Sequence, residues 1–409
     1  MTGKLPVLAV LIVVFVVALS AAFAWSDGAY SSSPPQGFID TVAGGGAGCT
    51  EPCPATSAAL PPPYDVERDW WGNLYVADYQ GNRVRKVDNA GILTIVAGDG
   101  NAGIGGDGGL ATSAQVATPH AVAVDHLGNL YIAEYGWHRV RKVNTNGVIS
   151  TVAGGGGCER PCLATSAAVS YPSGMTVDAS GNLFIAEQGG AGLVSKVDLS
   201  GIISTVAGGG PGCTEPCPAT QASLSTPTDL SLDSSGNLYI AEHTGNVRKV
   251  DTLGIITTVV AVGADAVDVD PWDNLYVATG CRILRRAPGG NVSVVAGSDS
   301  ECGFSGDRGP ATDALMGSAY GVAAGRTSGG FYIADGGNAR IREVGGTAPV
   351  GGMAEAPQHE PQAVSSDGGS SAPSALAPVG IAAASTLLAA GAWYARKRRR
   401  AGPPGTCDR

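Results

Sequence analysis

The sequence lacks several features that would point to a particular function. No G-x-S-x-G motif is present, so a serine hydrolase built on that turn is not expected. The formal net charge is −10 and the only dense basic cluster, residues 396–400, lies near the C-terminus, so nucleic acid is not expected as a partner. No LPxTG motif precedes the C-terminal apolar run, which argues against sortase attachment. Between the two ends, no segment shows convincing helical periodicity.

Both ends of the chain carry an apolar run. Residues 1–24 contain Lys4, a long apolar stretch and the small-x-small sequence AFA ending at Ala24, which is typical of a secretory signal peptide; an uncleaved signal anchor is the alternative. Residues 378–395 are about long enough to cross a bilayer, and the basic tail 396–409 follows directly. Because positive charge stays in the cytoplasm, the sequence predicts a single-pass cell-membrane protein with an extracellular body.

The segment before the predicted membrane helix has a different composition. Residues 345–377 are rich in proline, glycine, serine and alanine, and cannot bury enough apolar surface to offset their chain entropy. We expect a disordered, flexible stalk here. Cys407 lies in the predicted cytoplasmic tail, where a free thiol is the simple interpretation and lipidation the alternative.

The body consists of one short motif repeated along the chain. Around each copy, apolar and polar residues alternate between Gly, Asn and Asp punctuation, which predicts four short strands per unit. An Asp-x-x-Gly-Asn segment precedes most copies and suits a tight hairpin turn, because Asp can bond its own backbone and Gly accepts a positive φ. The six copies are GNLYVAD from Gly72, GNLYIAE from Gly128, GNLFIAE from Gly181, GNLYIAE from Gly236, DNLYVAT from Asp273 and GGFYIAD from Gly329.

Four-stranded units at this spacing predict a β-propeller, in which radial repetition leaves only short, protected sheet edges. The sixth unit ends at Val344 without a final TVAG strand, whereas a solitary FIDTVAG segment begins at Phe38. Docking that segment beside the last unit gives every blade four strands. We therefore predict an all-β, six-bladed β-propeller over residues 38–344, closed by its N-terminal strand.

The repeat also carries a family resemblance. The segment GNLYIAEYGWHRVRKVNTNGVISTVAGGG, preceded by GDGGLATSAQ, resembles the repeats of NHL-repeat β-propellers, and the resemblance extends over all six units. It implies the propeller fold but leaves the function open, because NHL-like propellers include adhesive ectodomains, sensor domains of bacterial kinases and a few lyases.

Three of the long loops between blades contain two cysteines four residues apart. When the five long loops are aligned through a shared Ala-Thr, three have both cysteines and two have neither. Joint presence is what a disulfide would produce, and an exported domain lies in an oxidising compartment. No histidine lies near the pairs, which argues against zinc, and the spacing is longer than C-x-x-C. We predict Cys49–Cys53, Cys158–Cys162 and Cys213–Cys217, and a fourth disulfide between Cys281 and Cys302 in two loops of the same face.

Candidate ligand-binding residues lie where the repeats differ from one another. Two consecutive positions at the entry to each innermost strand are mixed and polar, and we expect them at the channel mouth on the face with the cysteine loops. The candidates are Tyr64, Asp65, His120, Ser173, Thr228, Asp229, Asp265 and Tyr320. Asp65, Asp229 and Asp265 have the oxygen ligands that suit Ca²⁺, or they line a hydrated channel. No other cofactor is expected, and the simple interpretation of His120 is a polar residue with satisfied hydrogen bonds.

Two further patterns are interpreted as structural. Acids end most of the second strands and face arginines of the third strands, which predicts cross-strand pairs. The acids are Asp78, Glu134, Glu187, Glu242 and Asp335, and the arginines include Arg83, Arg139, Arg248 and Arg340. The GDGG and GDRG loops around Asp107 and Asp307 suit glycine turns, with calcium or phosphate binding as the alternative.

Two functions are compatible with these observations. The first is a membrane-tethered extracellular propeller that acts as a non-enzymatic binding, adhesion or sensing module, with its loop face in contact with an extracellular protein or glycan. The second is a Ca²⁺-assisted hydrolase or lyase, resembling lactonase-type propellers, with its site in the central channel. The sequence favours the first, because three aspartates and one histidine are fewer channel groups than catalytic propellers concentrate.

Overall fold

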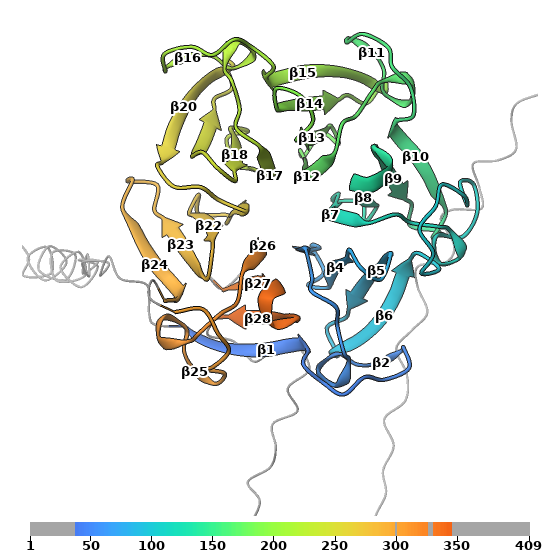
Figure 1. Ribbon diagram of the computed structural model, residues 1–409, viewed down its shortest axis with the longest axis vertical. Helices are drawn as coiled ribbons and strands as arrows, with labels where there is room; N and C mark the ends of the chain where they lie inside the picture. The colour runs from blue at the N-terminus through green and yellow to red at the C-terminus, as the bar shows by residue number, and fades with distance from the viewer. Residues whose placement is uncertain (1–36, 299–300, 326–329, 346–409) are drawn as a thin grey trace, which may run out of the picture. The chain divides into compact units, whose positions relative to one another are not determined.

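The alternating segments fold as antiparallel strands, and the strands form six sheets around a central channel (Figure 1). The computed structural model describes residues 37–298, 301–325 and 330–345. Within these ranges each sheet is a blade whose strands follow one another outward from the channel. The fold is the predicted all-β six-bladed propeller.

All six blades use the same order of four antiparallel strands. The innermost strands are β3 (Asp65–Arg68), β7 (Pro119–Val124), β12 (Pro172–Val177), β17 (Pro227–Leu232), β21 (Ala266–Val269) and β26 (Ala319–Ala324). The second strands are β4 (Leu74–Asp78), β8 (Leu130–Glu134), β13 (Leu183–Glu187), β18 (Leu238–Glu242), β22 (Leu275–Thr279) and β27 (Phe331–Asp335). The third strands are β5 (Arg83–Val87), β9 (Arg139–Val143), β14 (Leu193–Val197), β19 (Val247–Val250), β23 (Arg282–Arg286) and β28 (Arg340–Val344). The outermost strands are β6 (Ile92–Ala97), β10 (Ile149–Gly154), β15 (Ile202–Gly208), β20 (Ile255–Val260), β24 (Val292–Gly297) and β1 (Phe38–Gly44).

The turn from the first to the second strand of blades 1 to 5 is fixed by one aspartate. In blade 1, Asp69 Oδ1 accepts the backbone N–H of Asn73 at 2.8 Å and Oδ2 accepts its side-chain amide at 2.6 Å, while Gly72 has a φ of +94°. These contacts explain the Asp-x-x-Gly-Asn pattern, since the aspartate replaces backbone partners and the glycine accepts the left-handed conformation. The same aspartate contacts recur at Asp125, Asp178, Asp233 and Asp270.

The hydrophobic core lies between neighbouring blades. Successive residues of a strand point to opposite faces of its sheet, so Leu74 and Val76 pack toward blade 6 while Tyr75 and Ala77 pack toward blade 2. This two-sided burial explains why the NLYIAE motif is apolar almost throughout. Each seam between blades is thus a separate core cluster, and no blade is buried without its neighbours.

The N-terminal strand closes the ring. β1 lies between β28 and the two-residue strand β25 (Gly309–Pro310), and pairs with β28 in antiparallel register from Ile39↔Val344 to Gly44↔Arg340. Ile39 and Val42 are fully buried. The last blade is therefore built from both ends of the body, as the sequence predicts.

Long loops connect the outermost strand of one blade to the innermost strand of the next. They hold the short strands β2 (Cys53–Pro54), β11 (Cys162–Leu163), β16 (Cys217–Pro218) and β25, and the 3-10 helices η1 (Ala55–Ser57), η2 (Ala111–Ser113), η4 (Ala164–Ser166), η5 (Ala219–Gln221) and η6 (Ala311–Asp313). Two more 3-10 helices, η3 (Tyr135–Trp137) and η7 (Gly336–Asn338), lie in second-to-third turns. All four expected disulfides are present: Cys49–Cys53, Cys158–Cys162, Cys213–Cys217 and Cys281–Cys302.

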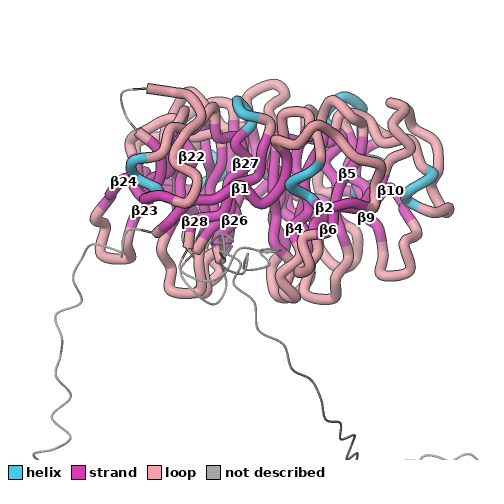
Figure 2. The backbone as a smooth tube through the Cα atoms, turned by 90° about the horizontal axis from the view of Figure 1, so that it is seen from below, coloured by secondary structure: helices cyan, strands magenta, loops and turns pink. Residues whose placement is uncertain are grey.

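The ring has two distinct faces (Figure 2). We call the face with the long loops and second-to-third turns the loop face. The opposite, chain-end face carries the first-to-second and third-to-fourth turns, and both ends of the described body: the backbone N–H of Gly345 donates to the carbonyl oxygen of Phe38 at 3.2 Å.

Several predictions fall outside the described residues. These are the signal peptide or anchor at residues 1–24, most of the stalk at 345–377, the membrane helix at 378–395 and the basic tail with Cys407. Within the part of the chain that the structure does describe, none of the helices is long and apolar enough to cross a membrane.

Candidate functional site

A continuous arc of aromatic side chains surrounds half of the channel mouth on the loop face. The Tyr64 ring stacks on Tyr79 with 4.4 Å between ring centroids, and lies 5.1 Å from both Tyr320 and His120. The arc continues from His120 to Tyr135 at a centroid distance of 5.0 Å. The structure thus brings together three of the predicted positions, Tyr64, His120 and Tyr320, from blades 1, 2 and 6 respectively.

The arc ends on blade 3 with residues that the sequence analysis missed. Tyr171 lies 5.1 Å from Tyr135 and 4.3 Å from His138, again between ring centroids. Tyr79 and Tyr135 follow the acid that ends a second strand, a position that reads Gln, His or Gly in the other blades. Variation among repeats, the criterion that identified Tyr64, would have found this position too.

Burial sets the protonation of the arc. Burial and then the neighbouring tyrosines Tyr79, Tyr320 and Tyr135 raise the pKa of Tyr64, so its hydroxyl stays protonated at neutral pH. Burial lowers the pKa of His120. His120 Nδ1 lies 2.8 Å from the carbonyl oxygen of Ser173 and must donate to it, which leaves Nε2 as an acceptor in the neutral ring. Tyr64 and His120 are therefore uncharged at the centre of the arc.

The remaining predicted residues on the other half of the mouth bind neighbouring blades. Ser173 Oγ lies 2.8 Å from the carbonyl oxygen of Pro227, and Thr228 Oγ1 lies 2.9 Å from that of Ala264. Each hydroxyl donates across a seam between two blades. Asp265 Oδ1 contacts Nδ1 of the exposed His243 at 2.6 Å.

Inside the channel, carboxylates also link adjacent innermost strands. Asp65 Oδ2 accepts the backbone N–H of Val122 in the next blade at 2.8 Å, and Asp229 Oδ2 accepts that of Val267 at 3.0 Å. Asp268, which the sequence analysis did not single out, does the same with Ala324 at 2.7 Å. Burial raises the pKa of Asp65 to about 6, and burial together with Asp65 raises the pKa of Asp229 well above its ordinary value.

Each of the three aspartates of the expected Ca²⁺ site has a protein partner in this structure. Asp65 and Asp229 accept hydrogen bonds from backbone N–H groups, and Asp265 contacts His243 instead of joining them. Among the residues that the structure describes, no group of three histidine, cysteine, aspartate or glutamate side chains is arranged to hold a metal ion. The inter-strand contacts explain these carboxylates without a cation.

The channel encloses a cavity of about 400 Å³. Its lining runs from Asp65 and Asp229 to turn residues of the chain-end face, among them Trp70 and Pro271. None of the aromatic arc lines this cavity. The arc and the cavity are therefore separate features at different depths of the ring.

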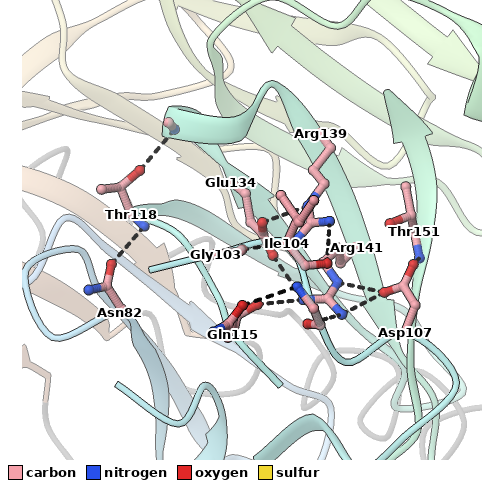
Figure 3. Close-up of polar contacts among 12 residues, drawn as sticks. Asn82, Gly103, Ile104, Asp107, Gln115, Thr118, Glu134, Arg139, Arg141 and Thr151 are labelled. Atoms are coloured by element: carbon pink, nitrogen blue, oxygen red, sulfur yellow. Dashed lines mark hydrogen bonds and ion pairs between the residues drawn. The ribbon is translucent and has the colours of Figure 1, made fainter. Parts of the chain in front are cut away.

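The acids that end the second strands belong to buried ion-pair networks (Figure 3). In blade 2, Arg141 is fully buried between Glu134, 3.4 Å from Nη1, and Asp107, 2.5 Å from Nη2, and it also donates to the carbonyl oxygen of Gln115 at 2.7 Å. Asp107 Oδ2 accepts the backbone N–H of Thr151 at 2.9 Å. Asp107 therefore holds its loop to the strand, and Asp307 does so through Arg342 at 2.7 Å.

The predicted cross-strand pairs are correct in part. Glu134 contacts Arg139 at 2.7 Å and Glu242 contacts Arg248 at 3.1 Å, as predicted. In blade 1, however, Asp78 pairs with Arg85, while Arg83 donates to the carbonyl oxygen of Asp99. The reason is that a long arginine reaches diagonally to the buried acid when it lies two residues further along the strand.

Comparison with known proteins relates this chain to one family. Residues 98–160 match the family model described as the teneurin NHL domain. Mouse teneurin-4 is 26% identical over 310 residues, which cover 66% of this chain and 10% of that protein. The chain thus spans about a tenth of the length of the curated relative. These matches confirm the resemblance to NHL-repeat propellers.

Solved structures share the fold at low sequence identity. A protein of unknown function from Bacteroides thetaiotaomicron aligns with a TM-score of 0.56 at 14% identity, covering 75% of each chain. An auxiliary nutrient binding protein from the same organism aligns with a TM-score of 0.53 at 16% identity, covering 75% of this chain and 76% of that one. At such identities the likeness shows the fold alone.

Proposed function

We propose that this NHL-like propeller, related in sequence to the teneurin NHL domain, is a membrane-tethered, extracellular, non-enzymatic binding or adhesion module. Its binding surface is the aromatic arc on the loop face, and its partner is an extracellular protein or glycan. The relation to the teneurin NHL domain is consistent with a binding or adhesion role.

The observation that carries the proposal is the arc itself. Six aromatic rings follow one another at centroid distances of 4.3 to 5.1 Å, in the order Tyr320, Tyr64, His120, Tyr135, Tyr171 and His138. A seventh ring, Tyr79, stacks on Tyr64 at 4.4 Å. Rigid tyrosines offer a large contact area at a low entropic cost and can hydrogen-bond at their hydroxyls, which suits protein and glycan partners.

The channel chemistry supports a hydrolase or lyase less well. A metal-assisted reaction needs ligands that are free to hold a cation. Asp65 and Asp229 instead accept inter-blade hydrogen bonds, and burial raises the pKa of both carboxyls. The carboxylates that would form the metal site are thereby used in joining the blades.

Beads coated with the full chain test the proposal. We expect the beads to be retained on a glycan array or on a layer of intact cells, and a Tyr79→Ser, Tyr135→Ser, Tyr171→Ser variant to be retained about tenfold less, since interface tyrosines often contribute most of the binding energy. Retention is measured by bead fluorescence after washing.

The matched control is Ile104→Ser, Phe304→Ser, which removes two exposed apolar side chains from the same face outside the arc. Equal retention of the arc variant and this control would count against the arc as the binding surface. A rise in thermal unfolding temperature with Ca²⁺ that disappears in Asp65→Ala, Asp229→Ala would instead favour the metal-assisted alternative.

A further inference from the structure

The chain-end face exposes large apolar side chains on every blade. Isolated apolar residues on a surface are ordinary, but a recurring set on one face indicates an interaction surface. Their exposed fractions are 71% for Trp70 and 55% for Trp71 in blade 1, 61% for Leu127 in blade 2, 76% for Leu199 in blade 3, 86% for Leu253 in blade 4, 52% for Trp272 in blade 5 and 61% for Phe38 in blade 6. We call these seven residues the apolar ring.

The apolar ring follows the rim and centre of one face. Trp70, Leu127 and Trp272 lie in first-to-second turns, and Leu199 and Leu253 lie in third-to-fourth turns, so all are at the same ends of the strands. The Trp71 ring lies against the turn of the neighbouring blade, since a Cβ atom placed on Gly128 would meet it at 3.0 Å. Side chains arranged in this way suit a flat partner better than a protruding one.

The carboxylates of this face are of two kinds. Those of the first-to-second turns are buried or half-buried, whereas those of the third-to-fourth turns, Asp88, Asp198 and Asp251, are half-buried or exposed. The turn aspartates are occupied by their own turns: Asp69, Asp125 and Asp270 are buried. Two of the turn aspartates also contact lysines, Asp125 with Lys142 at 3.7 Å and Asp233 with Lys249 at 3.4 Å. The face therefore keeps some negative charge, and the apolar ring rather than charge would supply its contact with a bilayer.

Both ends of the body leave from this face. Gly345 and Phe38 are hydrogen-bonded neighbours, and the predicted membrane segment at 378–395 begins 33 residues after Gly345. A membrane helix there, as the sequence predicts, would tether the body by this face. Tryptophan is also the residue that prefers the headgroup region of a bilayer, where its ring is partly wet and partly apolar.

We propose that the chain-end face docks on the surface of a lipid bilayer, with the apolar ring at headgroup depth. The loop face and its aromatic arc then point away from the membrane. The proposal rests on the membrane tether of the proposed function, but it concerns the opposite face and holds whether or not the arc binds a partner.

Quenching by brominated lipids tests this docking. The full chain, with Trp25, Trp137 and Trp393 replaced by Phe so that Trp70, Trp71 and Trp272 are the fluorophores, is reconstituted in phosphatidylcholine–phosphatidylglycerol vesicles. Lipids brominated near the headgroup end of the acyl chain are expected to lower the emission about twofold, because bromine quenches only tryptophan at that depth.

Variants of the apolar ring without tryptophan provide the comparison. Leu127→Ser, Leu199→Ser, Leu253→Ser keeps the fluorophores and should lose most of the quenching. The matched control Ile104→Ser, Tyr171→Ser, Phe304→Ser removes three exposed apolar side chains from the loop face and should keep the quenching.

Three results would overturn the proposal. If the chain floats with the vesicles but its tryptophan emission is not quenched, the chain is anchored in the bilayer while the chain-end face remains in water. A chain that does not float with vesicles would contradict both the docking and the tether. A dimer in sedimentation that the leucine variant dissociates, without quenching, would assign the apolar ring to a second copy of the chain.

Discussion

The five long loops share one equivalent position, midway between the two cysteines or their glycine and serine replacements. It is occupied by Glu51, Asp107, Arg160, Glu215 and Asp307. Four of them are acidic, and each of these contacts a third-strand arginine: Arg85, Arg141, Arg248 and Arg342 respectively. In blade 3 the strand position is Ser195, and the loop residue is Arg160, which contacts Glu187 at 2.7 Å and Ser195 Oγ at 2.6 Å. In blade 3, therefore, the arginine that contacts the buried acid comes from the loop instead of the third strand.

This exchange predicts a rescue between two residues. Arg160→Glu leaves Glu187 buried beside a second carboxylate, and should destabilise the body by about 4 kcal/mol, as expected when a buried pair loses one partner. Adding Ser195→Arg recreates the arrangement of the other blades and should restore most of that loss. Urea unfolding measures both variants.

The single variant Ser195→Arg is the control, because it places a second cation beside Arg160 and should not stabilise the protein on its own. If the double variant were no more stable than Arg160→Glu, the loop and strand positions would not be interchangeable.

At the scale of elements, the innermost strands are joined by side chains as well as by core packing. Asp65 connects β3 to β7, Asp229 connects β17 to β21, and Asp268 connects β21 to β26. Because burial raises the pKa of Asp65 to about 6, the fold favours its protonated form. The stabilisation from that proton is complete below the unfolded pKa of about 4, and is lost as the pH rises through the folded value.

Asp65→Asn should therefore remove part of the pH dependence of unfolding. The difference in free energy of unfolding, variant minus wild type, should increase by about 3 kcal/mol between pH 4 and pH 8. The wild type loses this stabilisation as Asp65 ionises, and one pKa unit corresponds to about 1.4 kcal/mol. Val122→Ala, at the same seam but not titratable, should change stability by the same amount at every pH. A flat difference for Asp65→Asn would show that the carboxyl does not titrate in this range.

Much of the element structure could be predicted from local patterns. The Asp-x-x-Gly-Asn turns, the strand repeats and the jointly present cysteines are each set by residues close together in sequence. The partners of Asp78 and Glu187 could not be, because which arginine reaches a buried acid depends on strand register and on a loop 27 residues away in the case of Arg160. Only part of the arc was predicted. Tyr64 and His120 lie at the variable positions where the innermost strands begin, whereas Tyr79 and Tyr135 lie in the second-to-third turns.

At the scale of the whole molecule, ring closure depends on one strand. β1 provides the outermost strand of the last blade and buries Ile39 and Val42 against its neighbours. The pair Asp40↔Glu343 joins the two ends of the body in the same register in which Lys196↔Ser204 joins two strands of blade 3. The two pairs are equivalent in geometry and differ in the length of chain between them.

A new disulfide at each pair measures the effect of that difference in chain length on stability. Asp40→Cys, Glu343→Cys closes a loop of about 300 residues and should stabilise the body by about 6 kcal/mol in the chain-entropy model. Lys196→Cys, Ser204→Cys closes about nine residues and should add about 3 kcal/mol. Urea unfolding with peptide mapping of the new bonds measures the difference, and equal gains would indicate that the ends are already held together in the unfolded chain.

The position of both chain ends on one face also determines how the ring responds to mechanical load. Tension applied between residues 38 and 344 peels β1 from β28 one hydrogen bond at a time, because the two ends are neighbours. Tension between the loop face and Val344 acts along β28 and loads its bonds to both β1 and β27 together, since ladder bonds lie across the strands. A ring held at its loop face and pulled from its C-terminal end is therefore loaded in shear, the direction in which its sheet resists best.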